Sequence, residues 1–178
     1  SVDRGLAKSK EVFNDLIAIA RVETHAKQFE QAEKTYLEAL AVAKDTGSEK
    51  QLASVYAGLG ANAIHAKKFE EARTFYEKSR EEAARSSDYV GECQARLSLA
   101  MLLKREGKLA EALKEVEAAR ALLGDNTQEA FVGQVLKTLA EMKEFSGDTA
   151  GAIEAYGRAA AIFNECGEGA GEAICLYS

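Results

Sequence analysis

Apolar residues recur along the chain at spacings of three, four and seven positions, the spacing that places side chains on one face of an α-helix. One such stretch predicts a helix over about residues 51–66, a short polar turn at Lys67 and Lys68, and a second helix over about residues 69–85. No segment alternates apolar and polar residues for long enough to indicate a β-strand. The pattern therefore predicts an all-α chain built from pairs of helices.

The helical pattern repeats every 40 residues. Four segments align without gaps, and they begin at Phe29, Phe69, Leu109 and Thr149. Three columns of this alignment hold small residues: Ala20, Gly60, Ala100 and Ala140; Ala32, Ala72, Ala112 and Ala152; Ala39, Ser79, Ala119 and Ala159. Small side chains let two helix axes approach closely, so these columns predict where neighbouring helices pack against each other.

The repeat predicts four helical hairpins within a single domain over residues 1–178. Their approximate ranges are 11–48, 51–88, 91–128 and 131–168, and the joints between them, such as 124–127 and 167–169, are rich in capping and turn residues. Residues 172–178 align with the start of a fifth hairpin, so we expect the chain to be a fragment of a longer protein. Residues 1–9 are expected to be a joint or the remnant of an earlier helix.

The residues of the second unit carry a family resemblance. The positions that carry it are Leu59-Gly60, Phe69, Ala72, Tyr76 and Ser79, and together they resemble the tetratricopeptide repeat. The resemblance covers essentially the whole chain and implies an α-α superhelix, a tetratricopeptide solenoid of four helical hairpins plus a partial fifth. The usual unit has about 34 residues, and the longer unit here is expected to lengthen the second helix of each hairpin. The chain also lacks the proline that commonly ends a unit. This long form resembles the repeats of kinesin light chains and of Pins/LGN-type adaptors, and those of some bacterial peptide-sensing regulators.

Composition narrows the classes of partner. The 178 residues are 47% hydrophobic and 29% charged, which is typical of a globular chain. Lys and Arg total 23 against 29 Asp and Glu, and a net charge of −6 disfavours binding to nucleic acid or to an anionic membrane. The three cysteines, Cys93, Cys166 and Cys175, show no C-x-x-C spacing and favour a reducing compartment, so we expect a cytoplasmic protein.

A binding surface is expected on the first helix of each hairpin, called helix A, because stacked hairpins line their concave surface with it. The outward positions of helix A form a basic track in the first three units, made of Arg21, His25, His65, Lys104 and Arg105. Ile17, Ala57, Leu97 and Met101 would form its apolar floor, whereas Glu141 and Glu144 make the fourth unit acidic. We expect this track to receive an acidic or carboxylate-bearing peptide. The alternative is a solvated face whose polar residues serve solubility alone.

The resemblance to the tetratricopeptide repeat also excludes one subclass of that family. Repeats that clamp the C-terminal carboxylate of heat-shock chaperones use Lys, Asn and Arg on helix A, and the matching positions here hold Ile17, Arg21, Gly58, Gln94 and Ser98. The sequence contains no nucleophile-elbow, zinc-protease or P-loop motif, so we expect no enzyme and no cofactor. His25 and His65 share a column but supply only two of the three or four ligands that zinc requires, so we expect no metal site.

The sequence therefore predicts a protein–protein interaction module or scaffold that binds a peptide or helix of a partner in its concave groove, as part of a larger adaptor. Two alternatives stay open. One is a peptide-sensing regulatory domain of a signalling protein, and the other is a structural scaffold that associates with itself.

Overall fold

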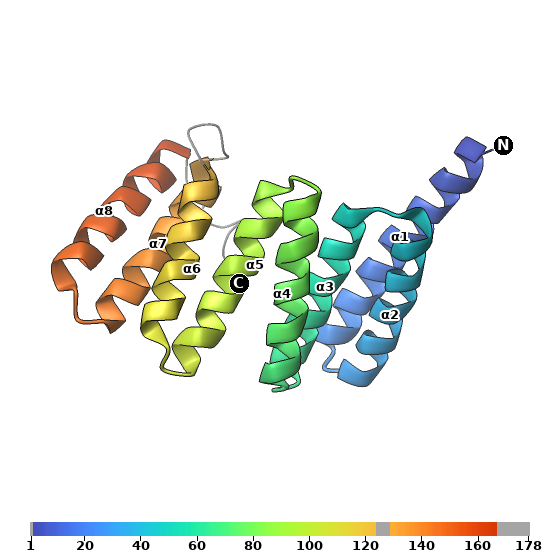
Figure 1. Cartoon of the computed structure of the whole chain (residues 1–178), viewed down its shortest axis with the longest axis horizontal. Coiled ribbons are helices and arrows are strands. Elements are labelled where there is room, and N and C mark those ends of the chain that lie inside the picture. The colour runs from blue at the N-terminus through green and yellow to red at the C-terminus, as the bar shows by residue number, and fades with distance from the viewer. Residues whose placement is uncertain (1, 124–128, 167–178) are drawn as a thin grey trace. The chain divides into compact units, whose positions relative to one another are not determined.

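The computed structural model describes residues 2–123 and 129–166, which form eight α-helices and no β-strand (Figure 1). The helices are α1 (Val2–His25), α2 (Phe29–Thr46), α3 (Glu49–His65), α4 (Phe69–Arg85), α5 (Tyr89–Arg105), α6 (Leu109–Leu123), α7 (Glu129–Phe145) and α8 (Thr149–Cys166). The prediction of paired helices repeated every 40 residues is confirmed for these residues. The joints expected at 124–127 and 167–169, and the start of a fifth hairpin at 172–178, lie outside the described residues.

The first helix differs from the expectation. Residues 2–9 were expected to be a joint or the remnant of an earlier helix, but they continue α1, which has 24 residues. No proline interrupts this segment, so the helical backbone continues through it.

The turn between the two helices has the same conformation in all four hairpins. One residue in each turn has a left-handed backbone: Lys27 (φ 62°), Lys67 (φ 62°), Gly107 (φ 77°) and Gly147 (φ 84°). The next N–H in the chain donates to the carbonyl five positions back, as from Gln28 to Glu23 at 2.9 Å. This pattern caps the preceding helix and reverses the chain. Glycine adopts the conformation freely at two of the four positions, and lysine adopts it at the other two at some cost.

The small-residue columns lie where helices meet. Ala20, Ala32 and Ala39 have no exposed surface. A Cβ atom on Gly60 would lie 2.8 Å from Cε1 of Tyr76, which is closer than packed carbon atoms allow. The absence of a side chain at Gly60 on α3 therefore leaves room for the Tyr76 ring of α4, in the same hairpin.

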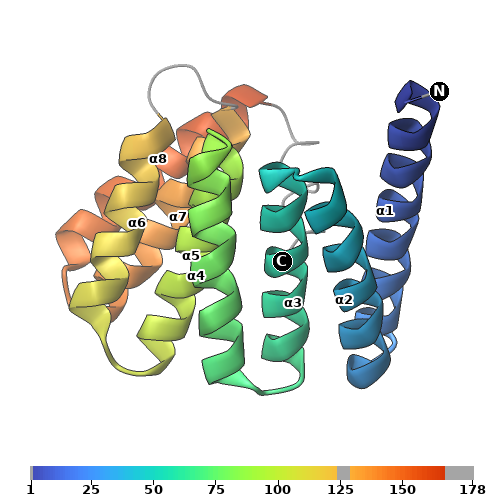
Figure 2. The same ribbon diagram turned by 45° about the vertical axis from the view of Figure 1, so that its right-hand side comes forward.

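The chain divides into two compact units, Ser1–Ala95 and Arg96–Ser178. In the first unit α1 packs on α2, α2 on α3 and α3 on α4, with a further contact between α1 and α3 (Figure 2). Its buried core includes Phe13, Tyr36, Val55 and Leu59.

In the second unit α6 packs on α7, and α7 packs on α8. The buried side chains of this unit include Val116, Val135, Leu139 and Met142. Within the described residues of both units, no helix is long and apolar enough to cross a bilayer.

Candidate interaction surfaces

The first unit carries three of the seven predicted site residues. Arg21 and His25 on α1 and His65 on α3 are all exposed. The Tyr36 hydroxyl forms a hydrogen bond with Thr24 and interacts with the positive charge of Arg21. Burial raises the pKa of Tyr36, and the hydrogen bond with Thr24 and the positive charge of Arg21 offset only part of that increase.

The second unit carries the other four predicted residues. On α5, Leu97 and Lys104 are half-buried, Met101 is 49% exposed and Arg105 is exposed. The Lys104 ammonium lies 5.4 Å from the centroid of the Phe145 ring, which is within the range of a cation–π contact. Lys104 is therefore held against an aromatic side chain of the next repeat.

Phe145 belongs to this surface although it was not among the predicted site residues. It shares its register column with His25, His65 and Arg105, and its side chain is 62% exposed. A large aromatic residue in a column that is otherwise basic is a signal that the sequence itself contains. We name Leu97, Met101, Lys104, Arg105 and Phe145 the helix A face of the second unit.

An acidic group borders this face. The Tyr156 hydroxyl on α8 lies 3.1 Å from Oε2 of Glu144 on α7. Desolvation, the hydrogen bond to Glu144, and the negative charges of Glu144 and Glu141 all raise the pKa of Tyr156. Tyr156 therefore stays protonated and donates to the carboxylate at neutral pH.

A pocket lies between α2, α3 and α4 in the first unit, with a volume of about 230 Å³. We call it the α2–α3–α4 pocket. Its apolar lining comes from Phe29, Leu59, Ala63, Ala66 and Phe75. The sequence pattern did not predict it, because the pocket depends on how far three helices stand apart.

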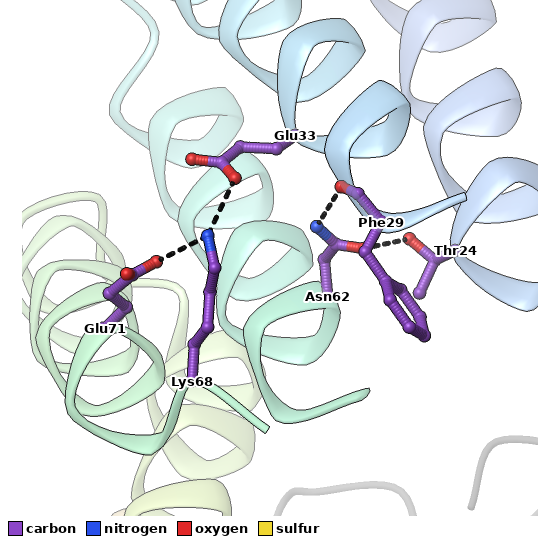
Figure 3. Close-up of polar contacts among 6 residues, drawn as sticks. All are labelled: Thr24, Phe29, Glu33, Asn62, Lys68 and Glu71. Atoms are coloured by element: carbon purple, nitrogen blue, oxygen red, sulfur yellow. Dashed lines mark hydrogen bonds and ion pairs between the residues drawn. The ribbon is translucent and has the colours of Figure 1, made fainter. Parts of the chain in front are cut away.

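Charged side chains form the polar part of this pocket. Nζ of Lys68 lies 3.3 Å from Oε2 of Glu33 on α2 and 3.3 Å from Oε2 of Glu71 on α4 (Figure 3). The hydrogen bonds with Glu71 and with Glu33 raise the pKa of Lys68. Glu30 is the third carboxylate in the lining. The lining thus contains one ammonium group and three carboxylates.

A buried amide fixes the inner side of the pocket. Nδ2 of Asn62 donates to the carbonyl oxygen of Phe29 at 2.9 Å, and Oγ1 of Thr24 lies 3.1 Å from Oδ1 of Asn62 (Figure 3). Asn62 is almost completely buried, so both ends of its amide need these partners. Its register column otherwise holds Val22, Leu102 and Met142, and this polar exception is visible in the sequence. The contacts join α1, the start of α2 and α3.

Among residues 2–123 and 129–166, no three side chains of His, Cys, Asp or Glu are grouped so that they could hold a metal ion. Cys93 is buried and forms no disulfide, as suits a small apolar side chain packed between helices.

The repeated hairpins, the left-handed turn in each of them and the buried small-residue columns define a helical-repeat protein. Residues 14–85 match the family model described as Tetratricopeptide repeat. Residues 14–85 thus carry the tetratricopeptide repeat that the residue pattern predicts.

Solved structures share this fold at low sequence identity. BtubC (BKLC) from P. vanneervenii is 19% identical with a TM-score of 0.74, and the match covers 88% of this chain and 65% of BtubC. A putative kinesin light chain from Podosopora anserina with nearly identical repeats is 19% identical with a TM-score of 0.68, over 85% of this chain and 75% of that one. A Rap protein complexed with Competence and Sporulation Factor is 19% identical with a TM-score of 0.75, over 89% of this chain and 44% of the Rap protein.

These matches confirm the predicted fold class, an all-α tetratricopeptide solenoid. The chain spans less than two thirds of BtubC and less than half of the Rap protein. The search of curated proteins finds no match.

Proposed function

We propose that the chain is a protein-interaction module whose helix A face binds a peptide or helical segment of a partner protein. The observation that carries this proposal is the surface of the second unit. Met101 and Phe145 expose large apolar side chains there, and the Lys104 ammonium lies 5.4 Å from the Phe145 ring centroid. Exposed apolar groups rimmed by charge are typical of interaction sites.

The charges on this face favour a partner segment that is both apolar and acidic. Lys104 and Arg105 supply cations beside the apolar groups of Met101 and Phe145, so a carboxylate of the partner has a pairing group within reach of an apolar contact. The exposed Arg21, His25 and His65 extend the same preference to the first unit. We propose binding at this basic track, as part of a larger adaptor, and no catalytic reaction.

The fold supports a binding role. A Rap protein of the same fold has been solved in complex with Competence and Sporulation Factor. That likeness also favours a second candidate, a regulatory sensor in which ligand binding changes the shape of the repeat array. Small-angle scattering with and without the selected peptide separates the two, because a sensor changes its radius of gyration and a static adaptor does not. A cytoplasmic location accords with Cys93, which is buried and forms no disulfide.

A selection of displayed random peptides on the wild-type chain tests the proposal. Fluorescence anisotropy then measures each selected peptide against Phe145→Ala, Met101→Ser and a matched control, Ile153→Ser. Ile153 is an exposed apolar residue of the same unit, 68% exposed, but it lies on α8 rather than on helix A.

We expect Phe145→Ala to weaken binding by about tenfold or more, because truncation of an aromatic anchor commonly costs this much. Ile153→Ser should leave affinity within about twofold of the wild type. Raising the salt concentration should weaken binding as well, because the cations of the track are exposed. The proposal would be refuted if no peptide were selected. It would also be refuted if the selected peptides bound Phe145→Ala as tightly as they bind Ile153→Ser.

A further inference from the structure

The size of the α2–α3–α4 pocket limits what it can hold. Its volume of about 230 Å³ is smaller than the roughly 300–1,000 Å³ of pockets that enclose a whole small-molecule ligand. Phe29, Leu59, Ala63, Ala66 and Phe75 provide the apolar lining. One amino-acid side chain with a long apolar stem fits a pocket of this size and lining better than a complete small molecule.

The charge of the pocket favours a cation. Glu30, Glu33 and Glu71 carry three carboxylates, and Lys68 alone carries a positive charge. The Lys68 ammonium is shared between Glu33 and Glu71 at 3.3 Å each, with 45% of its side chain exposed. The lining thus keeps a negative excess that an entering cation would neutralise.

The geometry favours a guanidinium group over an ammonium group. Glu33 and Glu71 approach the same point from α2 and α4, as Figure 3 shows. A guanidinium group is planar and has five N–H donors in a fixed fork, so it can bond two carboxylates at once. The stem of an arginine side chain also packs well on aromatic rings.

The chain itself gives a parallel in the next repeat. Forty residues after Glu33, the same column holds Arg73, and Nε and Nη2 of that guanidinium group are buried. The repeat thus holds a half-buried arginine side chain of its own at this column. In the first repeat Glu33 stands there instead, and the space beside it is open.

We propose that the α2–α3–α4 pocket binds an arginine side chain of a protein partner. The stem lies on the apolar lining of the pocket, and the guanidinium group bonds Glu33 and Glu71 in place of the Lys68 ammonium. The residues that line this pocket differ from those of the helix A face. The pocket would therefore be a second site at which the chain recognises a partner protein.

An NMR titration tests the site with N-acetyl-arginine amide as the probe. N-acetyl-citrulline amide is the matched control, because it has nearly the same shape without the charge. We expect saturable shifts of the backbone amides of Phe29, Ala63, Ala66 and Lys68 with a millimolar dissociation constant, as befits a single side chain. Citrulline should give no saturable shift. Equal binding of the two probes, or shifts of other amides only, would overturn the proposal.

Three variants make the test specific. Lys68→Gln removes the competing cation and should tighten arginine binding about two- to fivefold, the range expected for one exposed ion pair. Glu33→Gln combined with Glu71→Gln should abolish saturable binding, whereas Glu38→Gln combined with Glu77→Gln, an equal charge change at exposed positions elsewhere on α2 and α4, should not. Lys68→Gln is the decisive variant because the proposal predicts tighter arginine binding. A variant that only loosened the structure would bind arginine more weakly.

All of these variants should bind the peptides selected for the helix A face as the wild type does. If the wild type binds the selected peptides but not N-acetyl-arginine amide, the pocket proposal alone is refuted. If Lys68→Gln leaves arginine affinity unchanged or weakens it, the proposal is wrong.

Discussion

Replacement of Gly58 by alanine should destabilise the first unit through the Tyr36 ring. Gly58 lies in α3, and Tyr36 comes from α2 of the preceding hairpin. A Cβ atom on Gly58 would lie 2.7 Å from Cζ of Tyr36 and 3.0 Å from its hydroxyl oxygen. The ring is 2% exposed and cannot move aside without disturbing its neighbours.

Two effects of opposite sign determine the magnitude. Overpacking of a closely packed site costs about 1–3 kcal/mol. Alanine is a better helix former than glycine by about 1 kcal/mol, so part of that cost is offset. We therefore expect Gly58→Ala to lower the free energy of unfolding by about 1 kcal/mol, within a range of roughly 0–2 kcal/mol.

Urea unfolding followed by circular dichroism measures this change, and two controls separate the effects. Gly157→Ala in α8 places a Cβ atom where no other atom lies within 4 Å, so it should stabilise the chain by about 0.5–1 kcal/mol. In a Tyr36→Ala background the obstacle is gone, and Gly58→Ala should change sign and become stabilising. If Gly58→Ala destabilises equally with and without the Tyr36 ring, the packing argument is refuted.

Three further predictions concern polar contacts. Asn62→Leu should lower stability by about 1–3 kcal/mol in urea unfolding, because the partly buried carbonyl of Phe29 loses the Asn62 donor, although leucine suits an apolar column. Asp88→Ala removes the carboxylate that accepts from the Gly91 N–H at 3.1 Å, and the loss of this helix cap should lower stability by about 1 kcal/mol in the same assay. The hydrogen bond from the Gly151 N–H is the main cause that holds the pKa of Asp148 below its usual value. The ionised Asp148 therefore stabilises the folded state above the pKa of the unfolded state. This stabilisation is lost as the pH falls through the lowered pKa of the folded state. Melting temperatures from pH 6 down to about pH 2 should therefore converge for wild type and Asp148→Asn at the acid end, and a constant gap would contradict this.

The sequence predicted the repeated architecture because its signals are local and occur four times. Lys27 and Lys67 occupy the same column as Gly107 and Gly147, and all four adopt the left-handed turn. Alignment thus identified a turn where the residue type alone would not. The length of α1 was not predicted, because no residue in 2–9 marks the helix start.

The candidate sites were predicted less completely, because they depend on contacts between helices. The columns predicted exposed residues on helix A, but they could not show that Lys104 lies against Phe145. Asn62 was a visible exception in an apolar column, yet its partners come from two other helices. The pocket lies between α2, α3 and α4, and the repeat pattern does not predict how far apart these helices stand.

An NMR titration of the chain with the tightest selected peptide tests the binding role of the helix A face most directly. We predict that saturating shifts cluster on the amides of Met101, Lys104 and Phe145, with the amide of Ile153 unchanged. Shifts confined to α8, or none at concentrations well above the dissociation constant measured by anisotropy, would contradict binding at this face.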